Sequence, residues 1–150
     1  GYYGDLWLDA EPTAEDVIKE FGNFDLSKYS EFVFCGYGEP TIQLDVLLSV
    51  AKYVRSVSDT TIRINTNGHA NLIHGYDVTP KFEGLIDEVS ISLNTADARS
   101  YQDLCHCEFG EAAYDALLEF ATDNIEELCD LCHKAQERFI VKCQNRVKII

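Results

Sequence analysis

The chain has 150 residues, the usual size of one domain, and its 46% of hydrophobic residues are enough to bury a core. It carries 26 acidic and 12 basic residues, and a formal net charge of −14 repels the phosphate backbone of nucleic acids. The sequence has no apolar run near the ~18 residues of a membrane helix and no signal-peptide pattern at its start. We therefore expect a cytoplasmic protein that binds neither nucleic acid nor membrane, with its six cysteines as free thiols.

The first elements alternate between helix and strand. The segment 13–16 after Pro12 has the composition of a capped helix start. The apolar run 32–35 then predicts a strand that is buried on both faces. Pro40 can open the next helix, because its missing N–H is not needed there. The apolar stripe of that helix is expected to consist of Ile42, Val46, Val50, Val54 and Val57.

The rest of the chain continues the alternation. A strand is predicted at 61–64, an irregular stretch at 69–80, and a short helix near 81–85. A third strand fits 89–93. Further helices and one strand are predicted at 95–104, 111–121, 124–135 and 139–143. Helices between strands indicate right-handed crossovers, so the predicted class is α/β with a parallel sheet, open or curled into a barrel.

Polar residues and glycines follow three of the predicted strands, at 36–40, 65–68 and 92–94. The carboxyl ends of parallel strands lie side by side and form the ligand-binding face, so these three clusters are expected to converge. Each of them is also compatible with an ordinary turn. Glu39 has two interpretations, since its carboxylate can cap the following helix or bind the ammonium group of a ligand.

Three motifs in this order resemble the radical S-adenosylmethionine (radical SAM) family. The segment 34–41 (FCGYGEPT) is similar to the glycine–glycine–glutamate–proline motif that binds the amino group of S-adenosylmethionine there. The segments 64–68 (INTNG) and 89–94 (VSISLN) resemble the family's third and fourth strand endings. Similarity at 66–75 (TNGHANLIHG), 101–105 (YQDLC) and 109–111 (FGE) points more closely to the TatD-linked radical SAM proteins.

The resemblance covers residues 1–121 and implies a partial parallel (βα) barrel, truncated at its N-terminus, in a single domain of residues 1–150 with a divergent tail at 122–150. It implies S-adenosylmethionine and a 4Fe–4S cluster as cofactors, an unknown small-molecule substrate and an electron donor. Glu39 and the Gly38 backbone would hold the ammonium group, and Asn67, Ser92 and Asn94 are candidates for the ribose or carboxylate. The full set of cofactor-binding candidates is Gly36, Gly38, Glu39, Asn65, Asn67, Ser92 and Asn94.

The sequence departs from the family because the three-cysteine loop C-x-x-x-C-x-x-C is missing. Three thiolates of that loop hold the cluster and leave one iron for S-adenosylmethionine. The chain is therefore expected to be inactive alone, as a fragment of a radical SAM enzyme. The alternative is a cluster-free relative that binds a ligand or a partner.

The cysteines permit two other readings. Cys129, Cys132 and His133 match the C-x-x-C-H pattern of covalent haem attachment, although both cysteines also fit the apolar stripe of a helix. The segment 105–107 (CHC) combined with Cys129 and Cys132 is a possible zinc site of unusual spacing.

Two further pairs of polar residues are expected to play no part in catalysis. His69 and His74 flank a loop beyond Asn67 and are interpreted as surface or turn histidines near a possible substrate path. Asp87 and Glu88 precede the third strand and are interpreted as solvated turn charges rather than as an acid–base pair.

Overall fold

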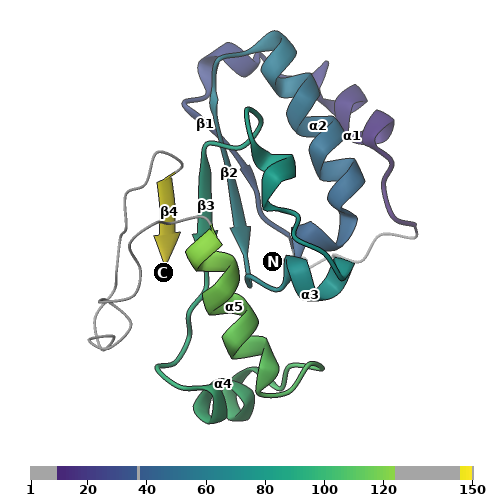
Figure 1. The fold of residues 1–150 in the computed structure, drawn as a ribbon. Helices are drawn as coiled ribbons and strands as arrows, with labels where there is room; N and C mark the ends of the chain where they lie inside the picture. Colours follow the sequence, from purple (N-terminus) through teal and green to yellow (C-terminus); the bar gives the residue numbers. More distant parts are fainter. Residues whose placement is uncertain (1–9, 37, 124–145, 150) are drawn as a thin grey trace, which may run out of the picture.

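The fold is known from a computed structural model that describes residues 10–36, 38–123 and 146–149. Four parallel strands form one sheet in the order of the sequence, and helices pack beside it (Figure 1). These strands are β1 (Glu31–Phe34), β2 (Thr61–Thr66), β3 (Glu88–Ile91) and β4 (Arg146–Ile149). The predicted α/β class with a parallel sheet is therefore confirmed.

The register of the sheet separates an apolar face from a polar one. Ile64 of β2 lies between Phe34 of β1 and Val89 of β3, and all three are on the apolar face. On the opposite face, Arg63 forms a two-pronged ion pair with Glu31, with Nε–Oε1 and Nη2–Oε2 distances of 3.0 and 2.8 Å. The helices therefore have one hydrophobic surface to cover, which places the core on one side of the sheet.

Helix α1 (Ala14–Phe21) begins as the sequence predicts. The Thr13 hydroxyl accepts a hydrogen bond from the Asp16 N–H at 3.2 Å, and the Asp16 carboxylate accepts one from the Thr13 N–H at 3.0 Å. This reciprocal capping box satisfies two N–H groups that have no partner within the helix. Phe21 ends the helix and packs on the core through Phe32 and Tyr53, with ring centroids 5.4 and 5.9 Å away.

Helix α2 (Leu44–Val57) confirms part of the expected inner face, because Val50 and Val54 are buried and Val46 packs against the core, but the buried face is broader than predicted. Ile42 and Val57 are 54% and 53% exposed, so they do not belong to the buried stripe. A 3₁₀ turn, η2 (Pro40–Gln43), precedes the helix and has three residues per turn, which changes the phase of the apolar positions. The buried residues of α2 are Leu44, Leu47, Leu48, Val50, Ala51 and Val54.

Two strands differ from their predicted form. Phe32, Val33 and Phe34 are only half-buried, because β1 is the edge strand of the described sheet, and Cys35 after it is exposed. Strand β3 ends at Ile91 instead of residue 93. The strand expected at 139–143 and the helix expected at 124–135 lie outside the described residues, and β4 was not anticipated at its position.

The connections contain short helices that the sequence pattern did not resolve. A helix, α3 (Ala70–His74), occupies part of the stretch expected to be irregular and ends at Gly75 with φ +72°. The short helix expected near 81–85 is a 3₁₀ turn at Thr79–Phe82, and another such turn spans Leu26–Lys28. Helices α4 (Ala98–Cys105) and α5 (Ala112–Asp123) follow the prediction.

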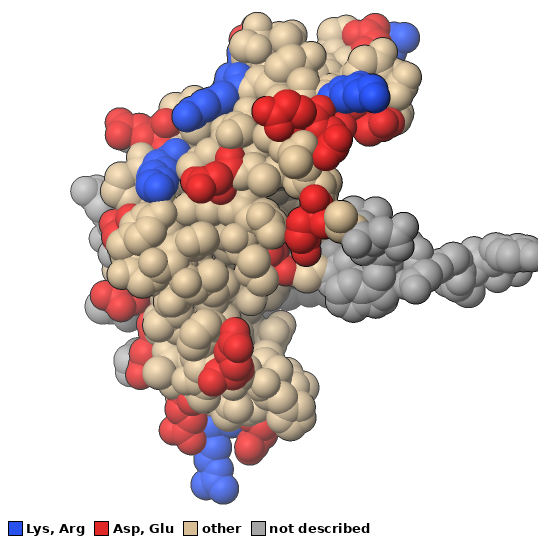
Figure 2. Space-filling model, turned by 90° about the vertical axis from the view of Figure 1, so that its right-hand side faces the viewer, with Lys and Arg blue, Asp and Glu red and all other residues tan. Residues whose placement is uncertain are grey.

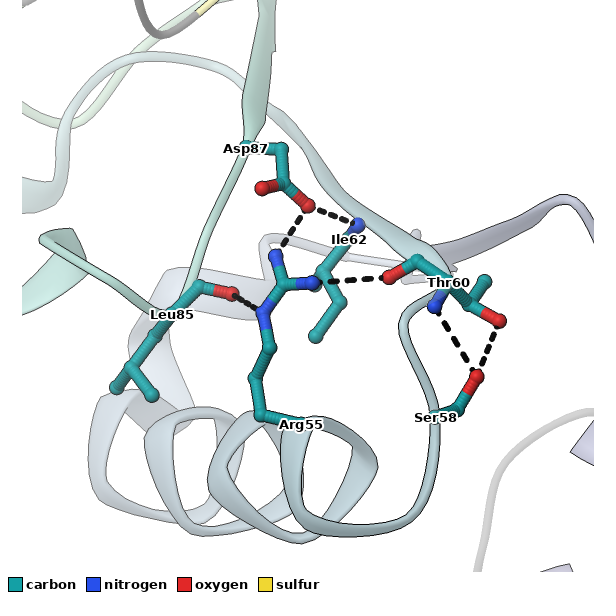
Figure 3. A network of polar contacts seen from close by, with 6 residues as sticks. All are labelled: Arg55, Ser58, Thr60, Ile62, Leu85 and Asp87. Carbon is teal, nitrogen blue, oxygen red and sulfur yellow. Dashed lines mark hydrogen bonds and ion pairs between the residues drawn. The ribbon is translucent and has the colours of Figure 1, made fainter.

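Asp87 is part of a polar network at the amino end of the sheet, so its interpretation as a solvated turn charge is wrong (Figure 3). Its Oδ2 pairs with the Arg55 guanidinium and accepts a hydrogen bond from the Ile62 N–H at 2.7 Å. Arg55 also donates to the carbonyl oxygens of Leu85 at 3.2 Å and Thr60 at 3.1 Å. The network therefore joins the end of α2 to the starts of β2 and β3.

None of the helices in the described part of the chain is both long and apolar enough to cross a membrane.

Candidate functional site

A cavity of about 600 Å³ opens where the carboxyl ends of β1, β2 and β3 meet α3, α4 and the turn that follows α4. Its volume lies within the ~300–1,000 Å³ that is common for small-molecule sites. Three predicted site residues from three different strand ends line it, so the expected convergence holds for them. The lining consists of Glu39, Ile42, Asn67, His69, Ile73, Asn94, Tyr101, Cys105, Cys107, Glu108 and Phe109.

Glu39 connects the first two strand ends through its carboxylate. Its Oε1 accepts hydrogen bonds from the Thr41 N–H at 3.0 Å, the Thr41 hydroxyl at 2.6 Å and the Thr66 hydroxyl at 2.8 Å. Its Oε2 accepts one bond, from the Asn67 N–H at 2.7 Å. The capping interpretation of Glu39 is thus realised, because it is the N-cap of η2. Each carboxylate oxygen has two lone pairs, and Oε2 accepts a single hydrogen bond from the described residues, so it can accept another from a ligand.

The turn after β2 brings Asn67 to the cavity. Asn67 Oδ1 accepts a hydrogen bond from the His69 N–H at 3.0 Å, which leaves its amide nitrogen as a donor. Gly68 has φ +80°, and a Cβ there would lie 3.0 Å from Leu117 Cγ and 3.1 Å from Ile91 Cγ2. Only glycine fits this position, because both the backbone conformation and the space exclude a side chain.

The remaining predicted site residues have different positions. Asn94 lines the cavity, is exposed, and donates to Cys105 Sγ at 3.5 Å. Ser92 is exposed and does not line the cavity. Asn65 is on the polar face of β2, where its side chain accepts from Arg63 at 3.1 Å.

The two glycines of the first motif are not equivalent. Gly36 lines a smaller space of about 240 Å³ between β1 and α2, and a Cβ there would lie 3.1 Å from the Gly38 carbonyl oxygen. The turn therefore leaves little room for a side chain at position 36, so a glycine is favoured there. At Gly38 a Cβ would meet no atom of the described residues within 4 Å, and Gly38 is exposed but does not line the cavity.

The lining also contains His69 and Tyr101, which the sequence did not assign to a site, and Cys107, which it placed in a possible zinc site. His69 is only 3% exposed, so its interpretation as a surface histidine is wrong. Its Nε2 lies 3.3 Å from the Tyr101 hydroxyl, and its Nδ1 lies 3.8 Å from Cys107 Sγ. His74 is half-buried, and its Nε2 lies 2.7 Å from the Thr41 carbonyl oxygen. The available signal was the position of His69 directly after the Asn67–Gly68 turn, but its partners come from a segment more than thirty residues away.

Burial determines the protonation states of His69 and Tyr101. Desolvation lowers the pKa of His69, although the nearby Glu39 carboxylate acts in the opposite direction. Burial and the neighbouring Cys105 raise the pKa of Tyr101. Near neutral pH both side chains are therefore uncharged, and Tyr101 keeps its hydroxyl proton.

The charge of the cavity is negative. Among the described residues that line it, Glu39 and Glu108 are acidic and none is Lys or Arg. Acidic side chains also outnumber basic ones on the face of the molecule in Figure 2. A cationic or neutral ligand is favoured over an anion at such a site.

The described residues provide no metal centre. Within 10–36, 38–123 and 146–149, no three His, Cys, Asp or Glu side chains are grouped to hold a metal ion. Cys35, Cys105 and Cys107 are free thiols. The haem pattern at Cys129, Cys132 and His133, and half of the possible zinc site, lie outside the described residues.

Comparison with known proteins identifies no relative: no family model, curated protein or solved structure matches this chain.

Proposed function

We propose that this chain is part of a cytoplasmic radical SAM protein and that it binds S-adenosylmethionine in the cavity at the carboxyl ends of its strands. The observation that carries the proposal is the meeting of Glu39, Asn67 and Asn94 around one cavity. These residues belong to the three segments whose sequences resemble the family. Free thiols such as Cys35 are compatible with the reducing cytoplasm.

The strand order supports a barrel-type arrangement. Each strand is parallel to the next one in the sequence, in the order β1-β2-β3-β4. Successive βα units of a barrel have this order. In a doubly wound sheet the strands are also parallel, but their order along the sheet reverses at a switch point.

The free hydrogen-bonding groups of the cavity suit the amino-acid part of S-adenosylmethionine. The remaining acceptor position of Glu39 Oε2 would bind the ammonium group. The amide nitrogen of Asn67 would donate to the carboxylate or ribose, and the Oδ1 of Asn94 would accept from a ribose hydroxyl. The net positive charge of the ligand, from its sulfonium and ammonium groups, would be favoured by the Glu39 and Glu108 carboxylates.

The residues of this chain do not fit a 4Fe–4S cluster, because its sequence lacks the three-cysteine loop and its described residues form no metal-ligand group. The proposal for this chain is therefore binding, without reductive cleavage. Cluster ligands, an electron donor and a substrate would come from outside these 150 residues.

Isothermal titration calorimetry of the 150-residue chain with S-adenosylmethionine tests the proposal. We expect binding that weakens about fivefold in Asn94→Ala, from the loss of one ligand hydrogen bond of about 1 kcal/mol. Ser92→Ala is the matched control, because Ser92 is exposed on the same loop and does not line the cavity. S-Adenosylhomocysteine, which lacks the sulfonium charge, is expected to bind more weakly.

Absence of binding, or equal losses in Asn94→Ala and Ser92→Ala, would contradict this assignment. The second candidate function, a cluster-free domain that binds another ligand or a partner, would then be preferred. One observation favours that candidate: three of the four hydrogen bonds to Glu39 converge on a single oxygen within the fold, as expected of a structural brace.

A further inference from the structure

Two residues that line the cavity, Cys107 and His69, combine a thiol with a buried imidazole. Cys107 is half-buried and lines the cavity, and its Sγ lies 3.8 Å from His69 Nδ1. The other ring nitrogen of His69 is held by Tyr101, which is 2% exposed, at 3.3 Å. A nucleophile, a base and a third group that orients the base are the elements of an activated nucleophile.

We propose that Cys107 is a reactive nucleophile, with His69 as its base, and that the cavity takes small neutral or cationic electrophiles into covalent reaction with this thiol. The inference does not rest on S-adenosylmethionine binding. It uses the geometry of His69, Tyr101 and Cys107, none of which the sequence resemblance assigns.

The protonation states of His69 and Tyr101 suit this role. When the Nε2–H of His69 donates to the Tyr101 hydroxyl, the lone pair of Nδ1 is directed to the Cys107 thiol. Burial lowers the pKa of His69, so the imidazole is uncharged near neutral pH, while the nearby Glu39 carboxylate and the Ala113 backbone favour the imidazolium that forms when it accepts the proton. The raised pKa of Tyr101 keeps its hydroxyl neutral, so it acts as a fixed partner of the ring and does not titrate with it.

The reaction with a model electrophile is simple to write. With iodoacetamide, the Cys107 proton moves to His69 Nδ1, the S–C bond forms, the C–I bond breaks and iodide leaves. The imidazolium then loses its proton to solvent. Only the thiolate is a strong nucleophile, so removal of the proton by a neighbouring base controls the rate.

The class of electrophile follows from the charge of the lining. Glu39 and Glu108 lie around the same cavity, and no Lys or Arg balances their charge within the described part of its lining. Anionic reagents are repelled in such a site, while neutral and cationic ones are admitted or attracted.

Alkylation with iodoacetamide near neutral pH, followed by peptide mass spectrometry, measures the rate at each cysteine separately. Cys35 is the internal control, because it is an exposed free thiol outside this cavity. Accessibility alone makes Cys35 the faster thiol, whereas the proposal expects Cys107 to react faster. His69→Asn is expected to lower the ratio of the Cys107 rate to the Cys35 rate at least about tenfold, as for loss of a general base.

Replacement of the buried His69 can also lower the stability of the fold. Tyr101→Phe therefore provides a second variant, one that keeps the aromatic packing. It is expected to reduce the same ratio several-fold by freeing the His69 ring. For the charge preference, a cationic and an anionic methanethiosulfonate reagent are compared. The ratio of cationic to anionic rates is expected to be higher at Cys107 than at Cys35.

A Cys107 that reacts more slowly than Cys35 in the wild-type protein would overturn the proposal. A rate ratio that neither His69→Asn nor Tyr101→Phe changes would also overturn it, and so would a preference for the anionic reagent. These outcomes are independent of whether S-adenosylmethionine binds, so the two proposals can fail separately.

Discussion

Replacing Glu39 by alanine is expected to destabilise the fold as well as the cavity. The carboxylate accepts four hydrogen bonds, from Thr41 N–H and hydroxyl, the Thr66 hydroxyl and the Asn67 N–H. Loss of an N-cap costs about 1 kcal/mol. A buried polar group left without a partner costs about 1–3 kcal/mol, and Thr66 is only 4% exposed. Thr41 is likewise buried, at 0% exposure, but water that enters the space left by the carboxylate can solvate part of these donors, so we expect a total loss of about 3 kcal/mol in the free energy of unfolding.

Urea denaturation followed by circular dichroism measures this loss. With a dependence of about 1.5 kcal/mol per molar urea, the midpoint would fall by about 2 M. Glu39→Gln is expected to lie between wild type and Glu39→Ala, because its amide oxygen can replace Oε1 while its NH₂ group faces the Asn67 N–H. Glu119→Ala, an exposed acid on α5, is the control and should change stability by less than about 0.5 kcal/mol. A Glu39→Ala midpoint equal to that of Glu119→Ala would refute the bracing role.

Two further predictions concern other parts of the fold. Asp87→Ala removes the ion-pair partner of Arg55 and the acceptor of the Ile62 N–H, so it should lower the free energy of unfolding by about 2 kcal/mol in the urea assay. The control is Asp59→Ala, at an exposed position, which should leave the free energy of unfolding nearly unchanged. Because burial lowers the pKa of His69, the unfolded chain binds more protons below its ordinary pKa of 6.5, so stability should rise with pH up to about that value and fall at more acid pH. His69→Gln should weaken this slope between about pH 5 and 7, and an unchanged slope would show that His69 is not the group responsible.

The convergence of the strand ends could be predicted from the sequence because it depends on local patterns. An apolar run followed by polar residues marks the carboxyl end of each strand, and parallel pairing then places Glu39, Asn67 and Asn94 at one edge. The capping box of α1 was equally accessible, since Thr13 and Asp16 are three residues apart. Such features need no knowledge of distant contacts.

Features that arise from tertiary packing were not predictable in this way. The predicted stripe of α2 is confirmed at Val50 and Val54, but the exposure of Ile42 was missed because this residue lies in the 3₁₀ turn before the helix. The burial of His69 depends on Tyr101 and Cys107, which reach it only after α4 has folded back over the strand ends. Asp87 follows the same rule, because its partner Arg55 lies thirty-two residues earlier in the chain.

The hydrogen bonds of Glu39 limit how the ligand preference of this cavity can evolve. A substitution there alters the fold and the ligand wall together, so most replacements are removed by loss of stability before a new specificity is tested. Asn94 is exposed and makes one weak contact with Cys105, and its replacement leaves the sheet intact. New ligand preferences are therefore expected to evolve through the loop after β3, while the glutamate after β1 stays fixed across otherwise divergent relatives.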